Sequence, residues 1–254
     1  MKRIIKISIT AVLFALLIFL CSCKSNDITQ PESTSAYTDL TTSETTAAEN
    51  QSYKEYYDCP EDFEELKSVN GDVYAYIVVP GTNIKYPVLI SPIDDNYYLR
   101  RDWKKRSSYR GCIFTQSCNA TDFSDPVTVV YGHNTDRGDM FSVLLNFKEK
   151  TFFDENEFFY IYQPDRTLVY RIFSAHTYDT RHIMNSYDFT SNKVLADFQD
   201  TLLNPQTLVR NVRDDAGLSD IDRVVILSTC AKPRSGSKER FLVNGVLKEE
   251  IIFE

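Results

Sequence analysis

Short runs of hydrophobic residues, several alternating with polar ones, follow one another along most of the chain. Runs of this length that are rich in β-branched and aromatic residues are typical of β-strands. They come in consecutive, hairpin-like order, with turn residues at 80–83 and 164–166, and none repeats at a fixed period. We therefore predict a mainly β fold, a closed or nearly closed barrel of eight strands. The expected strands are 72–79, 84–90, 111–115, 127–131, 157–163, 167–176, 221–229 and 240–251.

Helical spacing of hydrophobic residues interrupts this pattern in three places. Residues 60–69 predict a short amphipathic N-terminal helix that stops at Asn70-Gly71, and 140–147 predict a second helix. Residues 191–203 give the clearest pattern, and Pro205 ends it. This long helix is inserted before the last two strands.

Composition narrows the class of protein. The chain has 28 basic and 36 acidic residues, a formal charge of −8, which argues against a nucleic-acid partner. Its 43% hydrophobic and 25% charged residues are ordinary for a globular domain.

The N-terminus resembles an export signal. Lys2, Arg3 and Lys6 precede 17 uncharged residues, 7–23. Two interpretations stay open: an uncleaved signal anchor, or a lipoprotein signal with Cys23 lipidated after Leu20-Cys21-Ser22. Both tether the rest of the chain to the cell membrane, on its outer side.

Residues 24–52 have a different composition from the rest. They hold 12 Ser or Thr among 29 residues and few large apolar side chains. Such a segment cannot bury enough surface to fold, so we predict a flexible stalk. The folded domain is then 53–254.

Four cysteines fall in that domain: Cys59, Cys112, Cys118 and Cys230. Their spacing lacks the paired pattern of zinc sites, so we expect no metal. Because the domain is expected outside the cell, where disulfides form, a Cys112–Cys118 disulfide is an open alternative.

Three residues with catalytic potential stand at expected strand ends. Cys230 ends an apolar strand, His133 follows the strand 127–131, and Arg240 begins the last strand. An imidazole can shuttle a thiol's proton, and a guanidinium can stabilise an oxyanion. Singly, each has an ordinary alternative: a buried core cysteine, an exposed loop histidine or a surface arginine.

The motifs around these residues resemble those of one family. Leu227-Ser228-Thr229-Cys230, Tyr131-Gly132-His133-Asn134 and Arg240-Phe241-Leu242-Val243 are similar to the cysteine, histidine and arginine motifs of sortases. The N-terminal helix 60–69 and the helix 191–203 before the cysteine strand point to class B. Ile226 departs from the usual cysteine motif, an apolar change inside a strand.

This resemblance implies an eight-stranded sortase barrel and a cysteine transpeptidase of Gram-positive cell surfaces. Cys230 would attack the Thr carbonyl of an NPxT-like sorting motif in secreted surface proteins. His133 would protonate the leaving amine, Arg240 would hold the oxyanion or the substrate, and a peptidoglycan amine would resolve the thioester. No cofactor is implied. Substrate contacts are implied for Asn96, Tyr131, Ser228 and Thr229.

Other interpretations remain open. A secreted thiol protease shares nucleophile and base, although papain-like enzymes place Cys before His. A tethered binding lipoprotein would need no chemistry, and a pilin-polymerising sortase would differ only in its acceptor. The internal sequence Asn204-Pro205-Gln206-Thr207 is similar to a sorting motif, but we interpret it as a helix stop.

Overall fold

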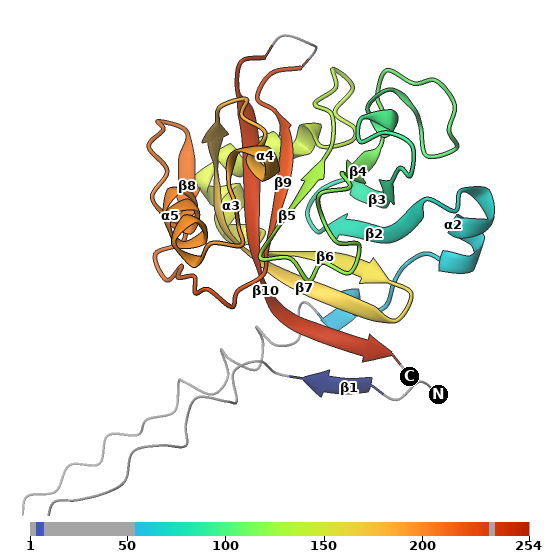
Figure 1. The fold of residues 1–254 in the computed structure, drawn as a ribbon, viewed down its shortest axis with the longest axis horizontal. Helices are drawn as coiled ribbons and strands as arrows, with labels where there is room; N and C mark the ends of the chain where they lie inside the picture. The colour runs from blue at the N-terminus through green and yellow to red at the C-terminus, as the bar shows by residue number, and fades with distance from the viewer. Residues whose placement is uncertain (1–3, 8–53, 234–236, 254) are drawn as a thin grey trace, which may run out of the picture.

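The computed structural model describes residues 4–7, 54–233 and 237–253, and its centre is a closed barrel (Figure 1). Eight strands form it in the order β10-β9-β5-β4-β3-β2-β6-β7, and β10 pairs back with β7 to close it. These strands are β2 (Val73–Val79), β3 (Ile84–Ile90), β4 (Ile113–Thr115), β5 (Val127–Tyr131), β6 (Phe158–Gln163), β7 (Arg166–Tyr178), β9 (Val224–Cys230) and β10 (Arg240–Phe253). The predicted eight-stranded barrel is confirmed.

Strand β9 shows why its own hydrophobic run is continuous. Val225 and Leu227 face the core inside the barrel, whereas Val224 and Ile226 pack in a second cluster on its outside. A strand covered on both faces needs apolar residues at every position.

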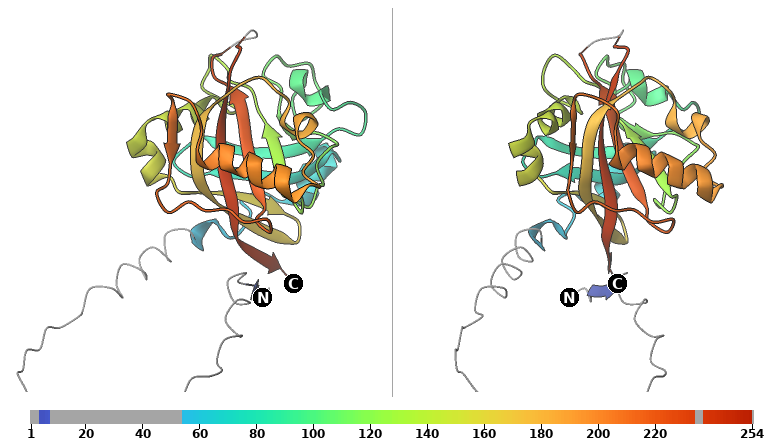
Figure 2. Two further views of the ribbon diagram at one scale, coloured as in Figure 1. Left: turned by 60° about the vertical axis from the view of Figure 1, so that its left-hand side comes forward. Right: turned by 90° about the vertical axis from the view of Figure 1, so that its left-hand side faces the viewer.

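The long helix α5 (Asn192–Leu203) covers that outer face, where Figure 2 shows it lying across β9 and β10. The Ser191 side chain accepts a hydrogen bond from the Val194 amide and so caps the helix start. Leu195, Phe198 and Leu202 are buried against the outer cluster. The long helix predicted before the cysteine strand is confirmed, as is the N-terminal helix, α2 (Phe63–Val69).

The remaining helical elements are short. They are α3 (Lys150–Glu155), α4 (Ile183–Ser186) and the 3₁₀ helices η2 (Lys54–Tyr56), η3 (Tyr97–Arg100) and η4 (Ser142–Lys148).

Three details differ from the sequence-based expectation. Strand pairs β3–β4 and β5–β9 are parallel, so the barrel is not a simple succession of hairpins. The helix expected at 140–147 is the 3₁₀ helix η4, whose buried Leu144 and Phe147 stand three residues apart, the 3₁₀ repeat. The short strand β8 (Arg210–Val212), which pairs with β7, was not expected.

The N-terminal predictions lie mostly outside the described residues. Of the expected membrane segment 1–23 the structure describes Ile4–Ile7, which form β1 and pair with the end of β10. The predicted stalk, 24–52, lies outside the described residues. Within the described part of the chain, no helix combines the length and apolarity needed to cross a bilayer.

Candidate active site

The thiol and the guanidinium are placed side by side by strand register. Cys230 is the last residue of β9 and Arg240 the first of β10, and the antiparallel pairing sets them opposite each other. The Arg240 Nη1 atom lies 3.6 Å from the Cys230 sulfur. The antiparallel pairing of β9 and β10 across their connecting loop therefore brings both groups to one end of the barrel.

His133 reaches the same end of the barrel by a different route. Strands β5 and β9 are parallel, with Tyr131 opposite Ser228, so both strands end together. Beyond the strand ends, the Gly132 amide donates to the Ser228 carbonyl over 3.1 Å. The Asn134 side-chain amide donates to the Cys230 carbonyl over 2.8 Å. His133 and Cys230 consequently line one cavity of about 320 Å³.

The imidazole is held by backbone from another part of the chain. His133 Nε2 lies 2.8 Å from the Leu99 carbonyl oxygen, at the end of η3. A neutral ring that donates from Nε2 has its other nitrogen, Nδ1, free to accept a proton. The Leu99 carbonyl thus fixes the orientation of the His133 ring.

Gly111 allows η3 to approach His133 this closely. Its backbone has a φ of +59°, which glycine adopts without strain. A Cβ atom there would lie 2.7 Å from the Tyr98 oxygen, 2.9 Å from the Leu99 oxygen and 3.0 Å from His133 Cδ2. The position of His133 therefore depends on a glycine distant from it in the sequence.

The expected substrate-contacting residues have different surroundings. Ser228 and Thr229 are 5% and 2% exposed, and the Thr229 hydroxyl is buried without a hydrogen-bond partner. Tyr131 is half-buried and stacks on Phe114, and burial raises the pKa of its phenol. Asn96 is exposed at the start of η3 and does not line the cavity at Cys230. Their substrate contacts stay predictions.

The other described cysteines do not line the cavity at Cys230. Cys59, Cys112 and Cys118 are free thiols, so the Cys112–Cys118 disulfide left open by the sequence is not formed. Burial raises the pKa of Cys112 to about 12 and that of Cys59 to about 11. Because the thiolate is the nucleophile, these two are poor competitors at neutral pH.

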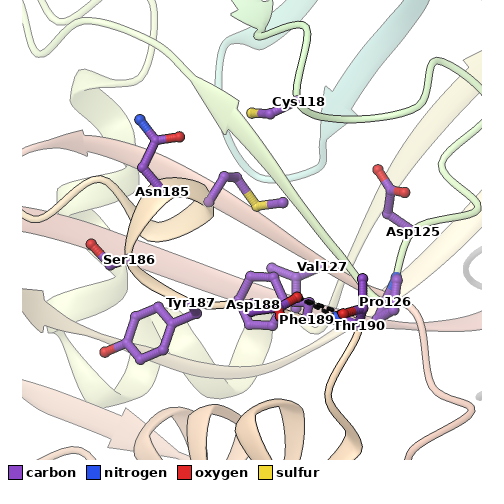
Figure 3. Close-up of a pocket in the computed structure, with 11 residues that line it drawn as sticks. Cys118, Asp125, Pro126, Val127, Asn185, Ser186, Tyr187, Asp188, Phe189 and Thr190 are labelled. Carbon is purple, nitrogen blue, oxygen red and sulfur yellow. Dashed lines mark hydrogen bonds between the residues drawn. The ribbon is translucent and has the colours of Figure 1, made fainter.

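A second cavity, of about 760 Å³, lies between the segment before β5 and the segment around α4 (Figure 3). Asp125, Pro126 and Val127 line one side, and residues 184–190 the other. The Asp188 carboxylate accepts hydrogen bonds from the amide and hydroxyl of Thr190. This cavity shares no lining residue with the one at Cys230, so the two are separate.

Several residues of the candidate site had not been expected from the sequence. The cavity at Cys230 is also lined by Arg100, Tyr109, Thr135 and Asp136. No local sequence pattern predicts that these four residues, or the Leu99 carbonyl, lie at the site. Among the described residues, no group of three His, Cys, Asp or Glu side chains is arranged to hold a metal ion.

Comparisons with known proteins agree with this geometry. A family model described as the sortase domain matches residues 77–248. Sortase B of Listeria monocytogenes is 27% identical over 187 residues, covering 74% of this chain and 74% of its own length. Sortase B of Staphylococcus aureus is 25% identical over 181 residues, covering 71% and 72%. The solved structure of Clostridium perfringens sortase B has a TM-score of 0.62 and 27% identity, covering 73% of this chain and 99% of that one.

The chain therefore belongs to the sortase family, and its relatives place it in class B. It is an enzyme of the transpeptidase type that defines this family.

Proposed function

We propose that the chain cleaves an NPxT-like sorting motif in secreted surface proteins and joins the threonine carboxyl to a peptidoglycan amine. In this proposal Cys230 is the nucleophile, His133 the general acid and base, and Arg240 the oxyanion donor. The N-terminal segment 1–23 tethers the enzyme to the membrane, with the domain outside the cell.

One observation carries the proposal: Cys230 contacts Arg240 on its own hairpin and lines one cavity together with His133. A carbonyl carbon attacked by the sulfur develops an oxyanion within reach of the guanidinium donors. The leaving nitrogen then needs a proton, which an imidazole at the same strand end can supply.

The reaction proceeds in two halves. First His133 takes the proton of the Cys230 thiol, the sulfur–carbon bond forms, the peptide bond breaks, and His133 gives that proton to the leaving amine. Then an acceptor amine attacks the thioester, its carbon–nitrogen bond forms as the carbon–sulfur bond breaks, and the proton that the amine loses passes through His133 to the departing sulfur. Each half moves one proton and needs no oxidant or reductant, so the described residues suffice.

Two competing functions predict different outcomes. A secreted thiol protease would transfer the acyl group to water alone. A binding protein would use neither thiol nor imidazole, although the contact of Arg240 with the sulfur favours chemistry.

The test is product analysis with a fluorescent NPxT-like peptide, with and without a small primary amine. We expect the amine to be incorporated at the threonine carboxyl at the expense of the hydrolysis product. A peptide with alanine in place of that threonine is the control. Cleavage that yields only the free acid at every amine concentration would contradict the proposal and support the protease.

A further inference from the structure

The cavity beside Cys230 has walls from two connections of the barrel. Arg100 and Tyr109 come from the connection between β3 and β4, and residues 133–136 from the loop after β5. Tyr109 is 60% exposed, so the cavity is open to solvent on that side. Arg240 contacts the sulfur of Cys230 but is not among the residues that line this cavity.

The charge of Arg100 is available to a ligand. Neighbouring arginines on the same connection are paired: Arg106 with Asp102, and Arg110 with Asp139. Arg100 is exposed, and its guanidinium has no hydrogen bond or ion pair with any residue in the described ranges 4–7, 54–233 and 237–253. An unpaired guanidinium that lines a cavity is suited to bind a carboxylate, with two parallel hydrogen bonds.

The position of His133 decides which reactant enters this cavity. The group that protonates the leaving amine also receives the proton of the incoming amine, because the second half-reaction reverses the first with a new amine. Both amines therefore meet the enzyme on the His133 side of the sulfur. After the leaving peptide departs, that side is free for the acceptor.

We propose that this cavity is the acceptor site and that Arg100 selects an amine whose own residue carries a free carboxylate. The acceptor class is then a diamino acid residue, such as the side-chain amine of a stem peptide, rather than an amine with no carboxylate nearby. The inference rests on the transpeptidase function proposed above. Arg100 is a specificity-determining residue here and takes no part in bond making.

The chemical step itself is unchanged by this binding. The acceptor nitrogen attacks the thioester carbon, a carbon–nitrogen bond forms and the carbon–sulfur bond breaks. The proton lost by the amine passes to His133, and the sulfur departs with the electron pair. Arg100 acts only by holding the acceptor close to that carbon.

The experiment compares two acceptors that differ in one group, Nα-acetyl-lysine and Nα-acetyl-lysinamide. Both present the same side-chain amine, and only the first has a carboxylate. For the unmodified chain we expect kcat/KM to favour the carboxylate by about tenfold, the effect of one charged hydrogen-bonded pair. The preference should shrink at high salt, since the site is open to solvent.

Arg100→Gln should bring the ratio of the two acceptors close to one. Arg137→Gln is the matched control, because Arg137 is also exposed and stands next to Asp136 but does not line the cavity. It should keep the full preference. Equal use of both acceptors by the unmodified chain, or an unchanged ratio in Arg100→Gln, would overturn the inference.

Two further measurements distinguish a failure of the acceptor assignment from a failure of the proposed function and from binding of the leaving peptide. If no sorting peptide acylates the chain, the proposed function itself fails. A second pair of donor peptides, with Glu or Gln after the threonine, tests the other source of a carboxylate. If Arg100→Gln slows acylation by the Glu peptide and leaves acceptor choice unchanged, Arg100 binds the leaving peptide and the acceptor assignment is wrong.

Discussion

The two sides of Cys230 are built in different ways. On one side, Arg240 is fixed by the register of two long strands that pair residue by residue. On the other, His133 stands on the loop after β5, and its imidazole contacts the Leu99 carbonyl, an approach that the absence of a side chain at Gly111 allows. The Arg240 side of the thiol, here called the sheet side, is thus set by a continuous strand ladder. The His133 side, the loop side, is set by separate contacts between loops.

This difference separates the roles that each side can take. A donor whose backbone is fixed by strand register suits the oxyanion, whose position changes little during the reaction. The loop side lines a cavity and suits the exchange of one amine for another. Substitutions on the two sides should therefore lower activity for different reasons and by different amounts.

The largest loss of activity is expected when the Cys230 sulfur, which lies on both sides, is removed. Cys230→Ala should lower transfer by at least about a thousandfold, because no other group can form the thioester. Product formation from the NPxT-like peptide measures it. Cys118→Ser, at an exposed free thiol, is the control and should keep full activity. Comparable activity in both variants would refute the role of Cys230.

On the sheet side, Arg240→Lys should lower kcat by about a hundredfold, the usual cost of losing an oxyanion donor. Lysine keeps the positive charge but not the planar donor geometry. Single-turnover acylation is the measurement, and an unchanged circular dichroism spectrum shows that the fold persists. Full acylation in this variant would mean that charge alone is sufficient.

On the loop side, Gly111→Ala should displace His133 and lower activity by about tenfold, a moderate loss for a misplaced acid and base. It should also cost about 1–3 kcal/mol of stability through backbone strain. The pH–rate profile should shift together with kcat.

Gly138→Ala is the matched control on this side. Gly138 also has a positive φ, +71°, but nothing lies within 4 Å of the position of its Cβ atom. It should lose stability and keep the unmodified pH–rate profile. Equal changes in both glycine variants would show that strain, and not contact with His133, explains the result.

The smallest effect on chemistry is expected far from both sides, near the other end of β10. Burial acts to raise the pKa of Glu250, but hydrogen bonds and charges from Arg223 and Arg166 outweigh it, so the pKa is lowered. A carboxylate with a lowered pKa stabilises the fold above its unfolded value of about 4.3, and this contribution disappears as the pH falls through the folded value.

Glu250→Gln should therefore cost about 1–2 kcal/mol at pH 7 and less near pH 3, with transfer activity unchanged. Thermal unfolding at the two pH values measures it. A stability difference that grows on acidification would contradict the ion-pair assignment.

The sheet side could be predicted from the sequence and the loop side only in part. Hydrophobic spacing located α5, and a loop between two strands implied that Cys230 and Arg240 meet. By contrast, the parallel pairing of β5 with β9, which brings His133 to Cys230, depends on strand order across the whole barrel.

Backbone contacts have no residue signature at all. The Leu99 carbonyl would be present whatever side chain stood there, and the need for glycine at position 111 appears only when η3 and His133 are both in place. Cysteine spacing likewise does not fix a distance in space, so it could not decide the Cys112–Cys118 bridge, and both thiols are free.

The most direct measurement is the intact mass of the protein after brief reaction with an NPxT-like peptide, followed by peptide mapping. We predict an acyl adduct on Cys230 that accumulates without amine and disappears when amine is added, with the acyl group recovered on that amine. An adduct on Cys118, Cys112 or Cys59, or cleavage with no adduct at any time, would contradict the convergence of thiol, imidazole and guanidinium at this end of the barrel.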